Sequence, residues 1–316
     1  MKHFNRTARD ARAEPRSLRL PSVIGAGPGC LILHERARRH HWQGRGWLSV
    51  KSFVSGQGIY RVGPARFAVD PEVYLLLNED QTYAVELEGR VEAESFCVFF
   101  EPGLASEVHR AMAANCGTLL DDPFPPAGQA LSFFERTYAH DSVFSRLQTL
   151  RATLFGPNEP LGLIQEEVCS LLQGMLLVHE AARLEARDFP GKKPATRIEL
   201  YRRLHRARDF MRASLDRDVQ LADIAGVACL SPNHLIRAFR HAFGLTPHQY
   251  LIGLRMTRAA HLLRHTNLPV GQVCLEVGFR APGSFSWLFA RRFGCPPSAF
   301  RAKKGDFGEA WPRASL

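Results

Sequence analysis

Apolar and polar positions alternate in the front part of the chain, which predicts strands. Between residues 30 and 125, short runs rich in β-branched and aromatic residues recur at intervals of about ten residues, separated by Gly and Pro. This spacing is typical of an antiparallel sandwich or a small barrel. The predicted strands are residues 47–50, 59–62, 66–69, 74–77, 83–87 and 96–100.

Apolar residues recur at helical spacing from residue 129 onward. We predict helix for the stretch that contains Leu131, Phe134 and Tyr138, for the stretch around Leu150, and for residues 161–184. The last of these has an apolar face broad enough to pack on the barrel or on a second subunit. Residues 189–196 are short, polar and proline-bearing, so we expect a linker there.

The rear part of the chain is predicted to be all-helical. An arginine-rich helix over residues 198–215 has its apolar side toward the helices that follow, and most of its arginines are expected to be solvated or near phosphate. These arginines are Arg202, Arg203, Arg206, Arg208 and Arg212.

The most specific pattern lies in residues 221–244. A short helix containing Ala225 and Ala228 runs into a turn at residues 229–230, and Ser231 with Pro232 supplies an N-cap and a first-turn proline for a second helix. The two alanines allow the helices to cross closely, which is the helix-turn-helix plan. The second helix is predicted to bury Leu235, Ala238 and Phe239 and to expose Asn233, His234, Ile236, Arg237, Arg240 and His241.

The same pattern recurs in residues 270–294, with a turn that is one residue longer. A helix over residues 248–265 is predicted to hold the two units apart. The outward positions of the second copy are Pro282, Gly283, Ser286 and Trp287, with Arg291 and Arg292 further along. Two such units suggest two recognition helices that enter successive major grooves, about 34 Å apart on one face of B-DNA.

Charge is unevenly distributed along the chain. The formal net charge of +10 divides into +4 for residues 1–20, −7 for residues 21–190, +2 for residues 191–196 and +11 for residues 197–316. A basic module joined to an acidic one is expected if only the basic module meets phosphate. Residues 1–20 lack the apolar segment of a signal peptide, so we expect a disordered basic tail and no secretory signal.

Cysteine and histidine usage argues against a metal centre or a disulfide framework. The seven cysteines are scattered and include no C-x-x-C pair, and Cys97, Cys229 and Cys274 are expected to pack as small apolar residues. His34, His40, His41 and His109 form no H-x-H pair, and residues 36–41 are interpreted as a solvated basic loop or edge. We therefore expect no metal, no cofactor and no catalytic residues.

Four motifs follow one another in the rear part. They are L-x-x-I-A…S-x-x-x-L-x-R-x-F…G in residues 221–244, T-P-x-x-Y in 246–250, R-x-x-x-A-x-x-L-L in 255–263, and V-G-F with F-G-x-x-P-x-x-F-R in 277–301. Residues 197–301 thereby resemble the DNA-binding region of the AraC/XylS family of bacterial transcription regulators. The resemblance implies base contacts at Asn233, Ile236 and Arg237, a cupin-like sensor barrel in front, and helices that dimerise it.

The second unit departs from the family pattern, because Trp287 stands where the family usually has an arginine. Tryptophan cannot pair bidentately with guanine, so this unit is expected to anchor to phosphate more than it reads sequence, or Trp287 merely packs. The candidate base-contacting residues are Asn233, His234, Ile236, Arg237, Pro282, Gly283, Ser286 and Trp287. The candidate phosphate-contacting residues are Ser231, Arg240, His241, Arg291 and Arg292.

These observations predict an α+β chain: a basic tail over residues 1–20, a cupin-like sensor and dimerisation domain over 21–188, the linker, two helix-turn-helix units over 197–302, and a tail over 303–316. The expected function is a cytoplasmic, homodimeric, promoter-binding regulator that responds to a small-molecule effector, with RNA polymerase as a partner if it activates transcription. The alternative is an effector-independent co-regulator or architectural DNA binder. No membrane span is expected. A repair methyltransferase of the kind fused to some relatives would need a cysteine cluster that is absent from the sequence.

Overall fold

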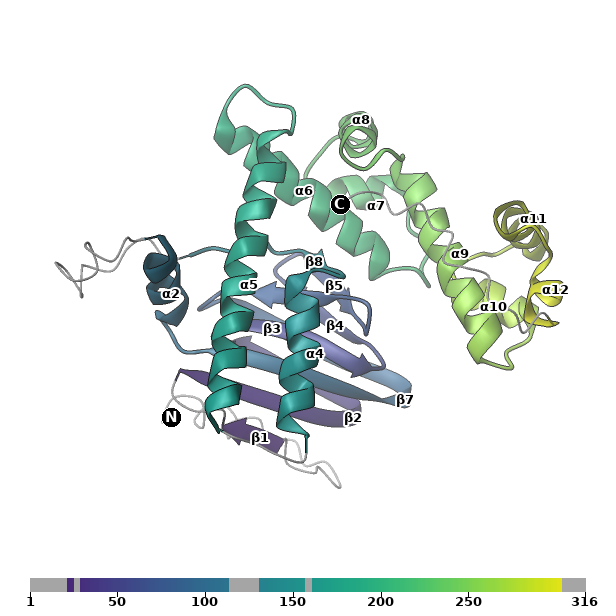
Figure 1. Ribbon diagram of the computed structural model, residues 1–316. Coiled ribbons are helices and arrows are strands. Elements are labelled where there is room, and N and C mark those ends of the chain that lie inside the picture. Colours follow the sequence, from purple (N-terminus) through teal and green to yellow (C-terminus); the bar gives the residue numbers. More distant parts are fainter. Residues whose placement is uncertain (1–21, 26–28, 114–130, 157–160, 303–316) are drawn as a thin grey trace. The chain divides into compact units, whose positions relative to one another are not determined.

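A computed structural model describes residues 22–25, 29–113, 131–156 and 161–302, which form two compact units (Figure 1). The units are Met1–Glu185 and Ala186–Leu316, and each is described by itself. The predicted tails, residues 1–20 and 303–316, lie outside the described residues. Within the described part of the chain, no helix has the length and apolar character needed to cross a membrane.

The first unit is built on an antiparallel sheet that curls into a near-closed barrel. Its longest strand, β7, pairs with β2 on one edge, and on the other edge it pairs with β4 near its start and β3 near its end. One bent strand shared by these three neighbours makes the sheet fold back on itself. The strands are β1 Ser22–Gly25, β2 Cys30–Arg45, β3 Leu48–Ser55, β4 Gly58–Val62, β5 Ala65–Val69, β6 Tyr74–Leu77, β7 Thr82–Phe100 and β8 Thr137–Tyr138.

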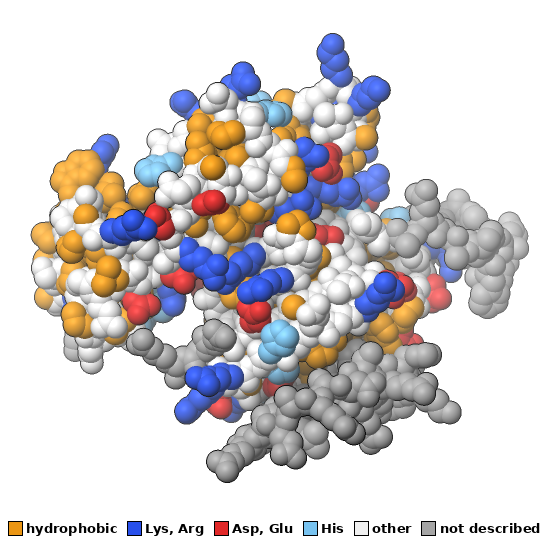
Figure 2. Space-filling model, turned by 180° about the vertical axis from the view of Figure 1, so that it is seen from behind, with side chains coloured by type: hydrophobic (Ala, Val, Ile, Leu, Met, Phe, Trp, Pro, Cys, Tyr) orange, Lys and Arg blue, Asp and Glu red, His pale blue; other side chains and the backbone are white. Residues whose placement is uncertain are grey.

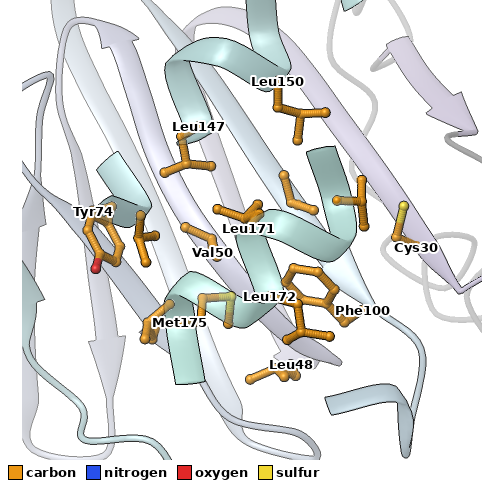
Figure 3. Close-up of a cluster of buried hydrophobic side chains, with 14 of the residues drawn as sticks. Cys30, Leu48, Val50, Tyr74, Phe100, Leu147, Leu150, Leu171, Leu172 and Met175 are labelled. Atoms are coloured by element: carbon orange, nitrogen blue, oxygen red, sulfur yellow. The ribbon is translucent and has the colours of Figure 1, made fainter. Parts of the chain in front are cut away.

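Two helices, α4 (Ser142–Leu154) and α5 (Leu161–Arg187), lie over the outer face of this sheet (Figure 1). Alternate residues of the strands meet them, because successive side chains of a strand point to opposite faces. Figure 3 shows the resulting layer, in which Leu48, Val50 and Phe100 of the sheet face Leu171 and Met175 of α5. The opposite residues of the same strands fill the barrel interior in a second apolar cluster, with Phe53, Tyr60, Phe67, Leu75, Leu77 and Val85 among its members.

The barrel confirms the predicted strands, with two corrections. Residues 83–87 and 96–100 belong to a single strand, because pairing with β2 resumes at residues 93–95 after a bulge instead of ending in a turn. For residues 36–41 the loop is wrong and the edge fits: they lie in a part of β2 that pairs with β7 alone, and Arg36, Arg38 and Arg39 are exposed there. A short helix, α2 (Leu104–Ala113), follows the barrel strands.

The helix predicted around Leu131, Phe134 and Tyr138 is wrong. Residues 131–136 have no regular structure, and Tyr138 lies in β8, which pairs with β6 through Tyr74 and stacks on its ring. The apolar spacing arises because Phe133, Phe134 and Tyr138 all insert into buried positions from an extended chain. The long helix predicted over residues 161–184 is confirmed as α5.

The second unit is all-helical and contains two small cores joined by one helix. The first core gathers α6, α7 and α8, and the second gathers α10, α11 and α12, while α9 contributes to both (Figure 1). The α+β architecture predicted from the sequence is therefore confirmed. The helices are α6 Pro194–Arg212, α7 Leu221–Val227, α8 Pro232–Phe243, α9 Pro247–His265, α10 Val270–Glu276, α11 Pro282–Phe293 and α12 Pro297–Ala302.

The arginine-rich helix α6 begins earlier than the sequence pattern indicates, with Pro194 in its first turn. Arg208 is not solvated: it is buried with Asp209, whose Oδ1 accepts hydrogen bonds from Nε and Nη2 of Arg208 at 3.2 Å. Tyr250 of α9 packs near this pair, and burial raises the pKa of its phenol. The pair is a structural element under the first helix-turn-helix unit, since a buried guanidinium needs a partner.

Candidate nucleic-acid interface

Helix α8 presents an exposed polar face because its apolar residues fix its rotation. Leu235 and Phe239 are fully buried four residues apart, and Ala225 and Ala228 of the preceding helix and turn are also buried, which confirms the close crossing predicted from the alanines. The helix begins as predicted, where the Ser231 hydroxyl accepts a hydrogen bond from the backbone N–H of His234 at 3.4 Å.

The predicted base-contacting residues of this unit lie on its outer face near the start of α8. Asn233, His234 and Arg237 are exposed and Ile236 is half-buried. Asn233, Ile236 and Arg237 line a shallow hollow of about 370 Å³. An amide can pair with adenine, a guanidinium with guanine, and an isoleucine side chain can contact the methyl group of thymine. The arrangement therefore offers three different base contacts within one turn of helix.

Arg240 and His241 lie in the last turn of α8, and both are exposed. Cationic side chains at this end also stabilise the helix itself, because the carbonyl end of the helix dipole is negative. The helix stops at Gly244, which has φ 72° and closes the last turn by donating its backbone N–H to the carbonyl of Arg240. Ser231, Arg240 and His241 are thus all accessible at the two ends of the helix.

Helix α11 is the matching element of the second unit, and its outer face is different. Phe285 and Phe289 are buried, Pro282 and Gly283 are exposed, and Ser286 is half-buried. Its N-cap is Ala281, so no side chain satisfies the first backbone N–H groups, in contrast to Ser231 at α8. Exposed N–H groups at a helix start can bind phosphate.

Trp287 is 60% exposed on α11 and does not serve as a core residue. The guanidinium of Arg291 lies 5.3 Å from the centre of its ring, which places a cation over the indole. Figure 2 shows hydrophobic side chains reaching the surface at the left of the view, where α11 lies. This face can contact sugars or base methyl groups, while its charge comes from Arg291.

Arg292 differs from Arg291, although both are predicted to contact phosphate. Arg292 is half-buried, its guanidinium lies 5.7 Å from the ring centre of Phe293, and burial lowers its pKa. Arg291 is exposed. Arg291 is thus the more accessible of the two cations.

The turns between the paired helices explain the extra residue of the second unit. Residues 228–231 separate α7 from α8, and residues 277–281 separate α10 from α11, which confirms the difference predicted from the sequence. The first turn uses Cys229 at φ 51°, and Arg203 of α6 donates to its carbonyl at 3.1 Å. Cys229 is exposed, so the prediction that it packs as a core residue is wrong: the left-handed backbone of the turn directs it outward.

Gly278 occupies the left-handed position of the second turn, at φ 77°. A Cβ atom there would lie 2.4 Å from the carbonyl oxygen of Leu215 and 2.7 Å from Nη2 of Arg255. Both are too close for any side chain, so this backbone approaches the loop after α6 as only glycine allows. The V-G-F motif therefore marks a contact between the two halves of the unit.

Two arginines reinforce this contact between the two helix-turn-helix units. The sequence had not predicted this role for either of them. Arg255 of α9 is 8% exposed and donates to the carbonyl of Arg217 at 2.5 Å, while Arg280 in the second turn bonds Asp218 Oδ2 at 2.5 Å. Burial lowers the pKa of Arg255. Together with the continuous helix α9, these bonds fix the position of one helix-turn-helix unit against the other.

The histidines and carboxylates of the described residues are arranged in pairs and not in a metal-ligand group. Among those residues, no three His, Cys, Asp or Glu side chains are grouped as metal ligands. His34 bonds Glu94 Oε1 at 2.8 Å through Nε2, and His40 lies 3.6 Å from Glu35. His34 and His40 are therefore partners of carboxylates on the sheet.

Comparison with known proteins places the second unit in a family. Residues 224–303 match the family model described as a helix-turn-helix domain. The chain is 35% identical over 99 residues to the HTH-type transcriptional activator RhaS of Enterobacter sp. (strain 638), covering 31% of this chain and 36% of that protein. It is 28% identical over 176 residues to the Msm operon regulatory protein of Streptococcus mutans, covering 54% of this chain and 60% of that protein.

A solved structure of an AraC-type transcriptional regulator from Chromobacterium violaceum is 30% identical, covers 34% of this chain and 95% of the solved chain, and has a TM-score of 0.32. The matches span 36 to 60% of the length of the two curated relatives. These relatives are regulators of transcription and not enzymes, in agreement with the class predicted from the sequence. The second unit of this chain is a DNA-binding helix-turn-helix domain of the AraC/XylS family of transcription regulators.

Proposed function

We propose that this chain is a sequence-specific regulator that binds promoter DNA through α8 and α11, placed in successive major grooves. The observation that carries the proposal is the exposed set Asn233, His234, Ile236 and Arg237 near the start of α8, on a helix whose rotation is fixed by buried Leu235 and Phe239. Base reading falls mainly to α8. Helix α11 adds Trp287 and Arg291 contacts to the backbone and to base methyl groups.

Selection from a random-sequence duplex library with the purified full chain tests this function. We expect an enriched sequence, and binding to it that exceeds binding to a scrambled duplex by a factor of about 10³ or more at physiological salt. The matched control is the variant Arg258→Ala, because Arg258 is an exposed arginine of α9 that lies outside the recognition face. If no sequence is enriched, the chain is a non-specific or architectural DNA binder.

The first unit is proposed to sense a small molecule inside its barrel. The support is the barrel itself, whose interior residues form a cluster separate from the layer under α4 and α5. A ligand there would change the packing of strands that also form the base for these helices. An effector-independent co-regulator is the alternative, and it is favoured if no small molecule raises the melting temperature of the full chain.

A homodimer is proposed to form through α5. Its inner face packs on the sheet, while Leu163, Leu177 and Leu184 remain 47 to 55% exposed on the other side at multiples of seven residues. A row of exposed leucines with this spacing fits a helix from a second copy. Dimerisation would bring two DNA-binding units onto one promoter.

Sedimentation of the full chain and of Leu177→Glu tests the dimer. We expect the wild type to sediment as a dimer and the variant as a monomer, because a carboxylate within a helix interface is desolvated without a partner. Leu275→Glu is the matched control, since Leu275 is 62% exposed on α10, outside the proposed dimer face. A wild-type monomer at micromolar concentration, or equal effects of both variants, would exclude this interface.

A further inference from the structure

Trp287 of α11 stands at the position that Arg237 has in α8. Both helices are 12 residues long, begin with a proline and are followed by a glycine in the left-handed region. The two buried residues that fix the rotation of α8 have buried counterparts in α11, Phe285 and Phe289, at the same positions of the helix. The two helices therefore present corresponding side chains outward, and Trp287 projects where Arg237 does.

The rest of the outer face of α11 offers little that can distinguish one base from another by hydrogen bonds. Gly283, which stands at the position of Asn233 in α8, has no side chain, and the neighbouring Pro282 has no donor. Ser284 is exposed and Ser286 is half-buried, but a hydroxyl group pairs with either kind of base. Any base preference of α11 therefore depends on its indole side chain.

The indole of Trp287 is held in an accessible position. It is 60% exposed, so it lies outside the core of the second unit. Arg291, one turn further along the helix, has its guanidinium 5.3 Å from the centre of the indole ring. This cation–π contact orients the ring and keeps a positive charge beside it that can meet a DNA phosphate. The pair fits a partner that presents an apolar group next to phosphates.

The major groove of DNA offers one apolar group that such a ring can contact. Among the four bases, only thymine carries a methyl group, on C5, and cytosine has a hydrogen atom at the same place. Methylation of cytosine at C5 gives that base the same methyl group in the same position. The two 5-methylpyrimidines differ in the neighbouring group, because thymine presents the acceptor O4 and 5-methylcytosine presents an amino group. The donor N–H of an indole therefore favours thymine over 5-methylcytosine.

We propose that Trp287 reads the C5 methyl group of a pyrimidine, so that the half-site of α11 contains thymine or 5-methylcytosine at one position and methylation of a cytosine there strengthens binding. This inference rests on the proposed function, in which α11 enters a major groove, and it names the group that α11 recognises. Loss of one methyl contact should weaken binding about fourfold, since a buried carbon of this kind contributes about 0.8 kcal/mol.

Base analogues in the selected duplex test the proposal on the unmodified full chain. The proposed function gives two protected segments in a footprint, and the α11 segment is the one that Arg237→Ala leaves protected. Each thymine of this segment is replaced in turn by deoxyuridine, which lacks only the C5 methyl group. We expect one replacement to lower the affinity about fourfold in fluorescence anisotropy. At that position, 5-methylcytosine should bind more tightly than cytosine by about threefold or more.

Variants at Trp287 then assign the methyl effect to the indole. With Trp287→Ala, the thymine and deoxyuridine duplexes should bind equally, because the contact is lost. Trp287→Arg should also abolish the methyl effect and create a preference for guanine in the α11 segment, since arginine pairs bidentately with that base. Because Trp287 is exposed, both changes are expected to leave the fold intact. Arg237→Ala is the matched control: it removes a recognition residue of α8 and should leave the ratio between thymine and deoxyuridine unchanged.

The proposal is overturned if the α11 segment contains no thymine, if no deoxyuridine replacement there lowers the affinity, if 5-methylcytosine binds no better than cytosine, or if Trp287→Ala retains the methyl effect. A Trp287→Ala variant that binds every duplex like the wild type also overturns it, and the exposed indole then fits a protein partner. The proposed function fails separately, when the library yields no enriched sequence or when only one segment is protected. Two protected segments without a methyl effect refute only the role of Trp287 and leave the proposed function standing.

Discussion

At the scale of single residues, the proposed reading of DNA depends on a few side chains of α8. Arg237 is exposed beside Asn233 and Ile236, and we expect it to pair bidentately with one guanine. Arg237→Ala should reduce affinity for the selected duplex by about 1–3 kcal/mol and relax the preference at one base pair. Fluorescence anisotropy on a set of single-base variants of the duplex measures both effects.

Arg258→Ala gives the comparison for this prediction. Arg258 is exposed on α9, so its loss removes a charge without removing a recognition side chain. It should weaken binding to all duplexes about equally and reduce the salt dependence. If Arg237→Ala lowers the affinity for every duplex by the same factor, then Arg237 contacts phosphate only.

Lys51 of β3 is 2% exposed, and the burial of its charge leads to a prediction on stability with a definite pH dependence. Its pKa is lowered to about 8 in the folded chain from 10.5, so below pH 8 both states carry the proton and the folded state bears the full penalty. Between these values the unfolded state holds a proton that the folded state lacks, and stability therefore rises with pH. Above pH 10.5 both states are neutral, and the cost of burying the charge of Lys51 is gone.

Lys51→Met should accordingly raise the free energy of unfolding of the first unit at pH 7, by ~3 kcal/mol at most. The gain should decrease as the pH rises from 8 toward 10.5. Urea unfolding of the full chain at pH 7 and pH 10, for wild type and variant, measures both statements. A variant that is less stable than the wild type at pH 7, or a gain in stability that does not change with pH, would contradict the claim that Lys51 is a buried cation.

At the scale of elements, the second turn depends on one glycine, Gly278. Gly278→Ala should destabilise the contact between the two helix-turn-helix units by at least ~1–3 kcal/mol, because the residue combines a left-handed backbone with a collision at Leu215 O. Hydrogen exchange of the full chain should show faster exchange in α10 and α11 than in α7 and α8.

Gly271→Ala is a stringent control for that experiment. Gly271 lies in α10, and a Cβ atom there would meet no heavy atom within 4 Å. Alanine favours helix over glycine by about 1 kcal/mol, so this variant should slow exchange in α10. If both glycine variants accelerate exchange equally, the left-handed turn is not the cause.

Elements with a strong local signal were predictable, and elements that depend on distant contacts were not. Ser231 and Pro232 define the start of α8 through groups within one turn, so the sequence alone located it. The run from Leu131 to Tyr138 has helical spacing, yet Tyr138 pairs with β6 across more than sixty residues. Likewise the central part of β7 is polar, and only its pairing with β2 makes it a strand.

The candidate interface was predictable on α8 and incomplete elsewhere. Periodicity separates buried Leu235 from exposed Arg237 without reference to any other element. The bonds from Arg255 to Arg217 and from Arg280 to Asp218 join residues 38 and 62 positions apart, and no local pattern reports them. Lys51 did leave a signal, because in the run LSVKSFV strand alternation puts it on the side of the apolar Phe53.

At the scale of the whole molecule, residues 21–190 are acidic and residues 197–316 are basic, as expected if only the second part meets the phosphates of DNA. Within the second unit, the two recognition helices are held together by α9, by the Gly278 contact and by the two arginine bonds. A unit held in this way would present α8 and α11 to DNA in one geometry, as proposed above. The spacing of its two contacts on DNA should therefore be fixed.

Hydroxyl-radical footprinting of the full chain on its selected duplex measures this spacing directly. We expect two protected segments on one face of the DNA, about one helical turn or 10 base pairs apart, with Gly278→Ala weakening protection of one segment and leaving the other. A single protected segment no longer than one major groove, abolished entirely by Arg237→Ala, would contradict the paired recognition helices.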